Sequence, residues 1–210
     1  IDHALRDDNL GQLWLLYKFQ REYFKPTVTQ VTRALQKERP DVLRALVAGD
    51  PDMPVTQQHV NSALEKEEAY HLCALADSSR FKATEAQVTR ALQNDEPSFL
   101  YCLARDRNMP VTQQHVNTAL EKPNYLWLRE LARSSHFSST EAQVTRALQK
   151  GTRDFLWQLA KDRHMPVTRQ HVDTALEQNN TGCLYALAQS SHFKVTAAQV
   201  TRALQKNSHL

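Results

Sequence analysis

Glycine is scarce in this chain, at 4 of 210 residues, where a typical protein has about 7%. Glycine provides the positive φ angles of tight turns and lets a backbone approach phosphate groups closely. Its scarcity argues against a hairpin-rich β fold, and the sequence contains neither G-x-G-x-x-G nor G-x-x-x-x-G-K-[ST]. We therefore expect a mostly helical protein that has no dinucleotide-binding loop and no P-loop.

The sequence also has few cysteines, no long hydrophobic run and only a small net charge. The three cysteines, Cys73, Cys102 and Cys183, are odd in number and scattered, so we expect reduced, buried thiols and a cytoplasmic, reducing location. No apolar run approaches the ~18 residues of a membrane span, and no signal peptide is visible, so we expect no membrane association. The net charge of +3 neither requires nor excludes a nucleic-acid partner.

An internal repeat of about 28 residues dominates what is present. The motif V-x-x-A-L recurs at a nearly constant spacing, and its first residues are Val31, Val60, Val88, Val116, Val144, Val172 and Val200, with an earlier copy at Ile1. We number each repeat from this residue, which is position 0. Leucines then recur at +12 and +15, threonine at −4 and a large apolar residue at −7.

These spacings predict two helices in each repeat. The threonine at −4 is a suitable N-cap, and a glutamine at −1 completes a capping box in four copies. The other copies have His59, His115 or His171 at −1, where we expect only a partial box. Helix A is predicted from −4 to about +5, with 0, +3 and +4 inward. Helix B is predicted from about +9 to +18, with +11, +12, +15 and +16 inward.

Two such short helices cannot bury their apolar faces alone, but stacked copies can. We therefore predict an all-α fold, an α-solenoid of about seven stacked two-helix repeats that forms a single domain over 1–210. The residue at −7 alternates between Phe and Met, which indicates pairs of repeats and a 56-residue super-repeat. The predicted units are 1–23 (partial), 24–52, 53–80, 81–108, 109–136, 137–164, 165–192 and 193–210 (partial). We expect a fragment of a longer array, or an array whose ends are closed by other segments.

The pattern T-x-x-x-V-x-x-A-L, followed by a short gap and a second apolar helix, resembles ankyrin-type repeats. The threonine cap and the small residues Ala34 and Ala63 with their equivalents carry the likeness, which covers almost the whole chain. Because ankyrin-like arrays act as protein-binding scaffolds, the resemblance implies that this chain binds another protein.

The sequence offers no candidate catalytic residues and no metal ligands. It contains no HExxH, CxxC or GxSxG motif, and we expect no cofactor. The recurring histidines are interpreted as surface or capping residues. The serine pairs that follow helix B, Ser78-Ser79, Ser134-Ser135 and Ser190-Ser191, are interpreted as helix-ending turns.

Two rows of residues are candidate binding surfaces. Positions +13 and +14 vary freely, and the row at +13 includes Trp14, Arg44, Tyr101, Arg129, Trp157 and Tyr185. Trp, Tyr and Arg are enriched at binding hot spots, but these side chains could instead fill the grooves between repeats. The second row is basic and lies at +2, with Arg33, Arg90, Arg146 and Arg202. It could contact a nucleic-acid backbone or form a solvated face of mixed charge.

Three functions remain open on this evidence. The first is a non-enzymatic scaffold that binds another protein, as part of a larger, effector-like protein that is delivered into a host cell. The second is a nucleic-acid-binding repeat protein that uses the arginines at +2. The third is a targeting domain of an enzyme whose catalytic domain lies outside this sequence.

Overall fold

The computed structural model describes residues 1–7, 9–19, 21–37, 39–66, 69–94 and 96–207. These residues form fifteen α-helices and one 3-10 helix and contain no strand, so the all-helical prediction is confirmed for them. The helices fall into two compact units, Ile1–Pro110 and Val111–Leu210.

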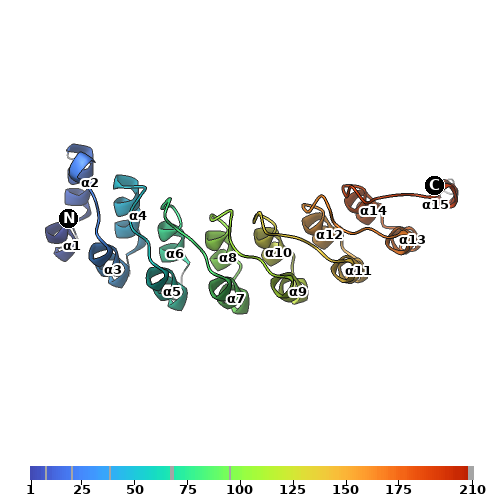
Figure 1. Ribbon diagram of the computed structural model, residues 1–210, viewed down its shortest axis with the longest axis horizontal. Helices are drawn as coiled ribbons and strands as arrows, with labels where there is room; N and C mark the ends of the chain where they lie inside the picture. The colour runs from blue at the N-terminus through green and yellow to red at the C-terminus, as the bar shows by residue number, and fades with distance from the viewer. Residues whose placement is uncertain (8, 20, 38, 67–68, 95, 208–210) are drawn as a thin grey trace. The chain divides into compact units, whose positions relative to one another are not determined.

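Unit 1 contains four A helices, each followed by a B helix. The A helices are α1 (Asp2–Arg6), α3 (Val28–Gln36), α5 (Gln57–Glu65) and α7 (Glu85–Gln93). The B helices are α2 (Leu10–Phe19), α4 (Pro40–Gly49), α6 (Tyr70–Leu75) and α8 (Ser98–Leu103), and η1 (Arg21–Tyr23) follows α2. Each A helix packs on its own B helix and on the next A helix, and each B helix packs on the next B helix. Unit 1 therefore has two layers (Figure 1).

Unit 2 continues the same order. Its A helices are α9 (Gln113–Glu121), α11 (Glu141–Gln149), α13 (Arg169–Glu177) and α15 (Ala197–Asn207). Its B helices are α10 (Leu126–Leu131), α12 (Arg153–Leu159) and α14 (Thr181–Leu187). The pairwise contacts within unit 2 repeat those of unit 1, with successive A helices in one layer and successive B helices in the other (Figure 1).

The predicted apolar positions form the core between the two layers. In the repeat that contains α7 and α8, Val88 and Ala91 come from helix A and Leu100 and Leu103 from helix B, and all four are fully buried. The same positions are buried in the inner repeats of both units, except that Leu184, at +12 of α14, is half-buried. The inward faces of helices A and B were therefore predicted correctly, apart from the additional buried position described below.

The threonine caps at −4 are confirmed. In α3, α5, α7, α9, α11 and α13 the threonine Oγ accepts a hydrogen bond from the backbone N–H at −1. Thr196 makes the same bond with Gln199, at 3.3 Å. The glutamine at −1 accepts from the threonine N–H in return, for example Gln87 from Thr84 at 2.9 Å.

The expectation of a partial capping box at the histidine repeats is wrong. The Nδ1 atom of His59 accepts a hydrogen bond from the Thr56 N–H at 3.3 Å, and His115 and His171 do the same at 3.2 Å. A neutral imidazole has one nitrogen acceptor, which here replaces the glutamine oxygen. All three histidines are buried and complete the box.

We expect Thr112→Ala to lower the free energy of unfolding by about 1 kcal/mol, because it removes the acceptor for the His115 N–H. Chemical denaturation of the purified chain measures this. Thr112→Ser keeps a hydroxyl and serves as the control, with a much smaller loss. A loss of stability as large for the serine variant would contradict the capping role.

Helix B is shorter than predicted in most repeats. Helices α2 and α4 reach +18, but α6, α8, α10, α12 and α14 end at +15. In the α6 repeat the N–H of Ser78 bonds to Leu75 O, three residues back, which tightens the chain into a turn. The Ser78 hydroxyl donates to Met53 O at 2.8 Å and accepts from the Arg80 N–H at 3.2 Å. The serine at +18 thus belongs to the turn, and the prediction of helix-ending serines is confirmed here.

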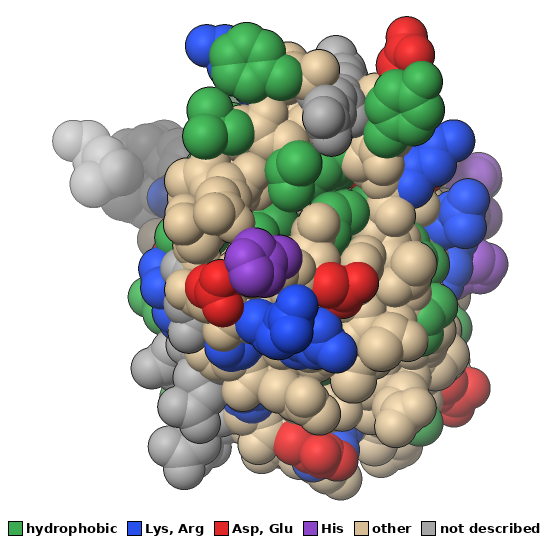
Figure 2. Space-filling view, turned by 90° about the vertical axis from the view of Figure 1, so that its left-hand side faces the viewer, with side chains coloured by type: hydrophobic (Ala, Val, Ile, Leu, Met, Phe, Trp, Pro, Cys, Tyr) green, Lys and Arg blue, Asp and Glu red, His purple; other side chains and the backbone are tan. Residues whose placement is uncertain are grey.

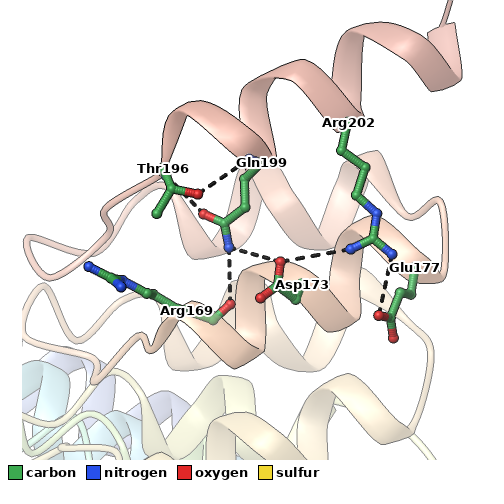
Figure 3. Close-up of polar contacts among 6 residues, drawn as sticks. All are labelled: Arg169, Asp173, Glu177, Thr196, Gln199 and Arg202. Carbon is green, nitrogen blue, oxygen red and sulfur yellow. Dashed lines mark hydrogen bonds and ion pairs between the residues drawn. The ribbon is translucent and has the colours of Figure 1, made fainter.

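Two kinds of polar contact alternate between successive A helices. One kind occurs where the A helix of a repeat with Phe at −7 follows the A helix of a repeat with Met at −7. The glutamine at −1 of the later helix then donates to an Asn or Asp at +1 of the preceding helix. Gln87 thus bonds to Asn61 at 2.8 Å, and Gln143 to Asn117 at 2.9 Å. The arginine at +2 adds an ion pair to the same neighbour. Figure 3 shows this arrangement between α15 and α13, where Gln199 bonds to Asp173 Oδ1 and to the Arg169 carbonyl.

The other interface uses histidine. Within unit 1, His59 Nε2 lies 2.8 Å from the Thr32 hydroxyl, and within unit 2, His171 Nε2 lies 2.9 Å from the Thr145 hydroxyl. Each threonine hydroxyl donates to a carbonyl of its own helix, so it accepts from the Nε2–H. Within each unit, the glutamine contact and the histidine contact thus occur at successive interfaces between A helices.

We expect acid to weaken the histidine caps. Burial lowers the pKa of both His59 and His171 below the ordinary value of 6.5. The unfolded chain therefore binds these protons first, so stability is complete above about pH 6.5 and falls as the pH drops toward the lower folded-state pKa. Denaturation midpoints measured between pH 7.5 and 5, roughly one ordinary titration range, test this. The His59→Gln/His171→Gln variant has glutamine at these positions, as the Phe-containing repeats do, and should lose less stability over this interval. A pH profile identical to that of the wild type would contradict the role of these histidines.

Candidate functional site

Position +13 points away from the core on the B helices where it is Trp14, Tyr101, Trp157 or Tyr185. The leucines at +12 and +15 are buried, apart from the half-buried Leu16 and Leu184. Because a helix turns by about 100° per residue, the residue after the first leucine lies beside the buried face. Trp14, Tyr101, Trp157 and Tyr185 are between 40% and 62% exposed. These exposures decide that the aromatic side chains at +13 are not enclosed between the repeats.

In unit 1 the side chains at position +13 make separate contacts. The Trp14 ring lies 5.9 Å from that of Tyr17, and the Arg105 guanidinium lies 5.7 Å from the Tyr101 ring centroid. Arg44 is exposed. The structure does not bring these three predicted residues together around one cleft.

In unit 2 the three predicted residues line one cleft. The rings of Trp157 on α12 and Tyr185 on α14 are stacked, with centroids 5.6 Å apart and an interplanar angle of 10°. Arg129 on α10 lines the same cleft, whose volume is about 740 Å³. The full lining is Tyr125, Arg129, Arg153, Asp154, Trp157, Gln158, Thr181, Gly182 and Tyr185.

Position +14, which the sequence pattern suggested as a variable surface, is in the core in every repeat after the first, where it is the exposed Leu15. Ala74, Cys102 and Ala186 are fully buried there, and so is Glu130. The Glu130 carboxylate is paired with Arg129 Nε at 2.7 Å and with Arg133 at 3.0 Å. The prediction for +14 is therefore wrong, because successive B helices pack against this position as well as against +12 and +15.

Positive charge surrounds this part of unit 2. Burial lowers the pKa of Lys161, Glu130 opposes this shift, and the nearby Arg133 and Arg129 add to it. Arg153 is 3.8 Å from Asp154, which is the one carboxylate among the described residues that line the cleft. Unlike the A-helix arginines, these cations outnumber the carboxylates beside them.

The basic row at +2 is paired along its length. Arg33 bonds to Asp2 at 3.0 Å, Arg90 to Glu65 at 3.5 Å, and Arg202 to Glu177 at 3.4 Å (Figure 3), while Arg146 is paired with Glu121. Each carboxylate belongs to the preceding A helix. These arginines therefore hold neighbouring A helices together, and their charge is largely neutralised.

The cysteine prediction is wrong for two of the three residues. Cys73 on α6 and Cys102 on α8 form a disulfide, and their Cα atoms lie 4.7 Å apart. The separation of 29 residues places them one repeat apart, at +13 and +14 of adjacent B helices. Cys183 is a free, buried thiol, as predicted, and burial raises its pKa.

A second hollow, of about 470 Å³, lies at the N-terminal end of unit 1. Figure 2 looks onto this end and shows hydrophobic side chains above a patch of mixed charge. Leu15 and Phe19 line the hollow and are exposed. In the inner repeats a preceding B helix packs against the corresponding helix. We therefore do not assign this face as a binding site.

Other kinds of site have less support. Among the described residues no group of three or more His, Cys, Asp or Glu side chains is arranged to hold a metal ion. In the same part of the chain no helix is long and apolar enough to cross a membrane.

Comparison of the chain with protein-family models, curated proteins and solved structures finds no match. The resemblance to ankyrin-type repeats therefore stays a prediction from the sequence pattern.

Proposed function

We propose that this chain is an α-solenoid and that it acts as a non-enzymatic module that binds another protein. The repeated contacts of A helix with A helix and of B helix with B helix within each unit support the solenoid. The ankyrin-like sequence pattern supports the same function.

The observation that carries the proposal is the aromatic cleft of unit 2. Its Trp and Tyr rings are exposed although Trp157 follows the buried Leu156, and they stack on one another next to Arg129. Large rigid side chains of this kind bury much area at little cost in conformational entropy, and they dominate the energetics of many interfaces. The stack thus provides a preformed contact surface.

In an affinity capture we expect the immobilised wild-type chain to retain a partner protein. The Trp157→Ala/Tyr185→Ala variant should no longer retain it. The truncations remove the stack but leave the leucines of the core in place. A Tyr101→Ala variant changes the same repeat position in unit 1 and serves as the control. Quantitative mass spectrometry compares the bound proteins. An unchanged set of partners for a folded double variant would reject the cleft as the contact surface.

Nucleic-acid binding through the arginines at +2 has less support, because each of these side chains is engaged with a carboxylate. A gel shift with DNA and RNA at low salt separates the two functions. Backbone binding would give a shift that weakens steeply as salt rises. The module could also direct a catalytic domain to a protein substrate, and the residues of the cleft would keep the same role.

A further inference from the structure

We propose that the cleft between α10, α12 and α14 binds an acidic peptide segment of a partner protein, and that this segment places a hydrophobic side chain on Trp157. The inference rests on the protein-binding function proposed above and adds the chemistry of the partner. Three properties of the cleft support the proposal: its positive charge, its stacked aromatic rings and a hydrogen-bond acceptor that has no partner among the described residues.

The charge around Trp157 is positive. Arg129 and Arg153 line the cleft, and Lys161 and Arg163 line a smaller hollow of about 240 Å³ that also contacts Trp157. The Glu130 carboxylate is fully buried and pairs with both Arg129 and Arg133, so its single negative charge offsets only part of this positive charge.

The nearby carboxylates do not balance these cations. Asp154 stands beside Arg153, and Asp162 accepts hydrogen bonds from the backbone and hydroxyl of Ser139. Burial is the largest cause of the lowered pKa of Lys161 and Glu130 opposes the shift, while repulsion from Arg133 and Arg129 adds to it. A carboxylate from a ligand would relieve this repulsion, which is the complementarity that an acidic segment supplies.

The aromatic stack adds an apolar platform. Trp157 is 43% exposed and Tyr185 is 62% exposed, so a hydrophobic side chain laid on them would remove apolar surface from water. A cleft of about 740 Å³ is within the range of sites that enclose a compact ligand or a few peptide residues.

Gln158 favours a peptide over a nucleic acid. Its side chain lines the cleft and is 5% exposed, and its Oε1 atom has no hydrogen-bond partner among the described residues. A peptide backbone offers an N–H donor at nearly every residue, whereas a phosphodiester backbone offers acceptors only. The stacked rings would have to separate before a base could insert between them.

Fluorescence anisotropy with defined probes tests this assignment on the whole chain. The probe is a fluorescein-labelled oligoglutamate peptide with one central Phe. Matched probes replace the Phe by Ala, or the glutamates by lysines, and an oligo-dT strand of equal length tests for nucleic acid. We expect the acidic Phe peptide to bind best and to weaken as salt rises.

Variants locate the binding. Arg153→Glu and Lys161→Glu reverse exposed charges and leave the core intact, so we expect each to weaken binding about tenfold or more. Trp157→Ala should remove the preference for Phe over Ala. Arg44→Glu and Tyr101→Ala, at +13 of unit 1, are the matched controls and should bind like the wild type. Circular dichroism verifies that each variant is folded.

Three results would overturn the inference: no binding of the acidic Phe peptide, binding that Arg153→Glu and Lys161→Glu leave unchanged, or tighter binding of oligo-dT. The affinity capture described above distinguishes failure of the acidic-peptide proposal from failure of the protein-binding function. A captured partner that depends on Trp157 and Tyr185, together with no affinity for the acidic peptide, would reject only the partner chemistry. If neither a captured partner nor affinity for the acidic peptide were found, the protein-binding function itself would be rejected.

Discussion

Leu128→Ala is expected to lower the free energy of unfolding of unit 2 by about 2–5 kcal/mol. Leu128 is at +12 of α10, is fully buried, and belongs to the row of leucines that joins the two helix layers. Truncation removes apolar contacts and leaves a cavity, because the helices on either side are held by their own repeats. Urea denaturation followed by circular dichroism measures the effect.

Leu128→Met is the control, because it conserves volume and should cost less than about 1.5 kcal/mol. The Leu128→Ala effect should also exceed that of Thr112→Ala, which removes only a cap. If the cap variant were the more destabilising of the two, the assignment of helices A and B to each repeat would be wrong.

Loss of the Cys73–Cys102 disulfide is expected to destabilise unit 1 by about 2–4 kcal/mol. The bond joins α6 to α8 and closes a loop with a sequence separation of 29 residues, which restricts the unfolded chain. Denaturation of the wild-type chain with and without a reducing agent measures the difference. The Cys73→Ala/Cys102→Ala variant should be insensitive to the reducing agent.

Thiol titration of the denatured, unreduced chain provides an independent measurement. With the disulfide formed, only Cys183 should react. Reaction of all three cysteines would show that the bond is absent and would restore the original prediction of reduced thiols.

The A helices could be predicted from the sequence because their signals are local. The threonine at −4 and the apolar residues at 0, +3 and +4 lie within one short segment, and every copy from Val31 onward carries them. The histidine caps were predicted only in part, as incomplete boxes. His59 occupies the position of Gln30 and Gln87, and both residue types offer an acceptor, so the repeat pattern contained the signal for a complete box.

The end of helix B depends on contacts that local spacing does not contain. Ser78 leaves the helix because its hydroxyl reaches Met53 O, 25 residues earlier in the chain. Burial at +14 is likewise set by the neighbouring B helix, and Glu130 is accommodated there because two arginines pair with it. The disulfide could have been inferred, since a spacing of one repeat plus one residue places Cys73 and Cys102 on adjacent B helices.

The candidate site was predicted in part. The repeat numbering placed Arg129, Trp157 and Tyr185 in one row at +13, and in the structure these three residues line one cleft. Gln158, at +14, also completes the lining. The sequence could not show that Arg153 and Asp154 do so, because their direction depends on where helix B begins.

Photo-crosslinking from position 185 tests most directly the claim that the cleft of unit 2 contacts a partner protein. The photoreactive residue p-benzoylphenylalanine replaces Tyr185, which is exposed beside Trp157. The same residue at Glu141, which is exposed at the start of α11, is the control. We predict a protein adduct from position 185 that Arg153→Glu abolishes, and no such adduct from position 141. Equal adducts from both positions, or adducts with nucleic acid alone, would contradict the account.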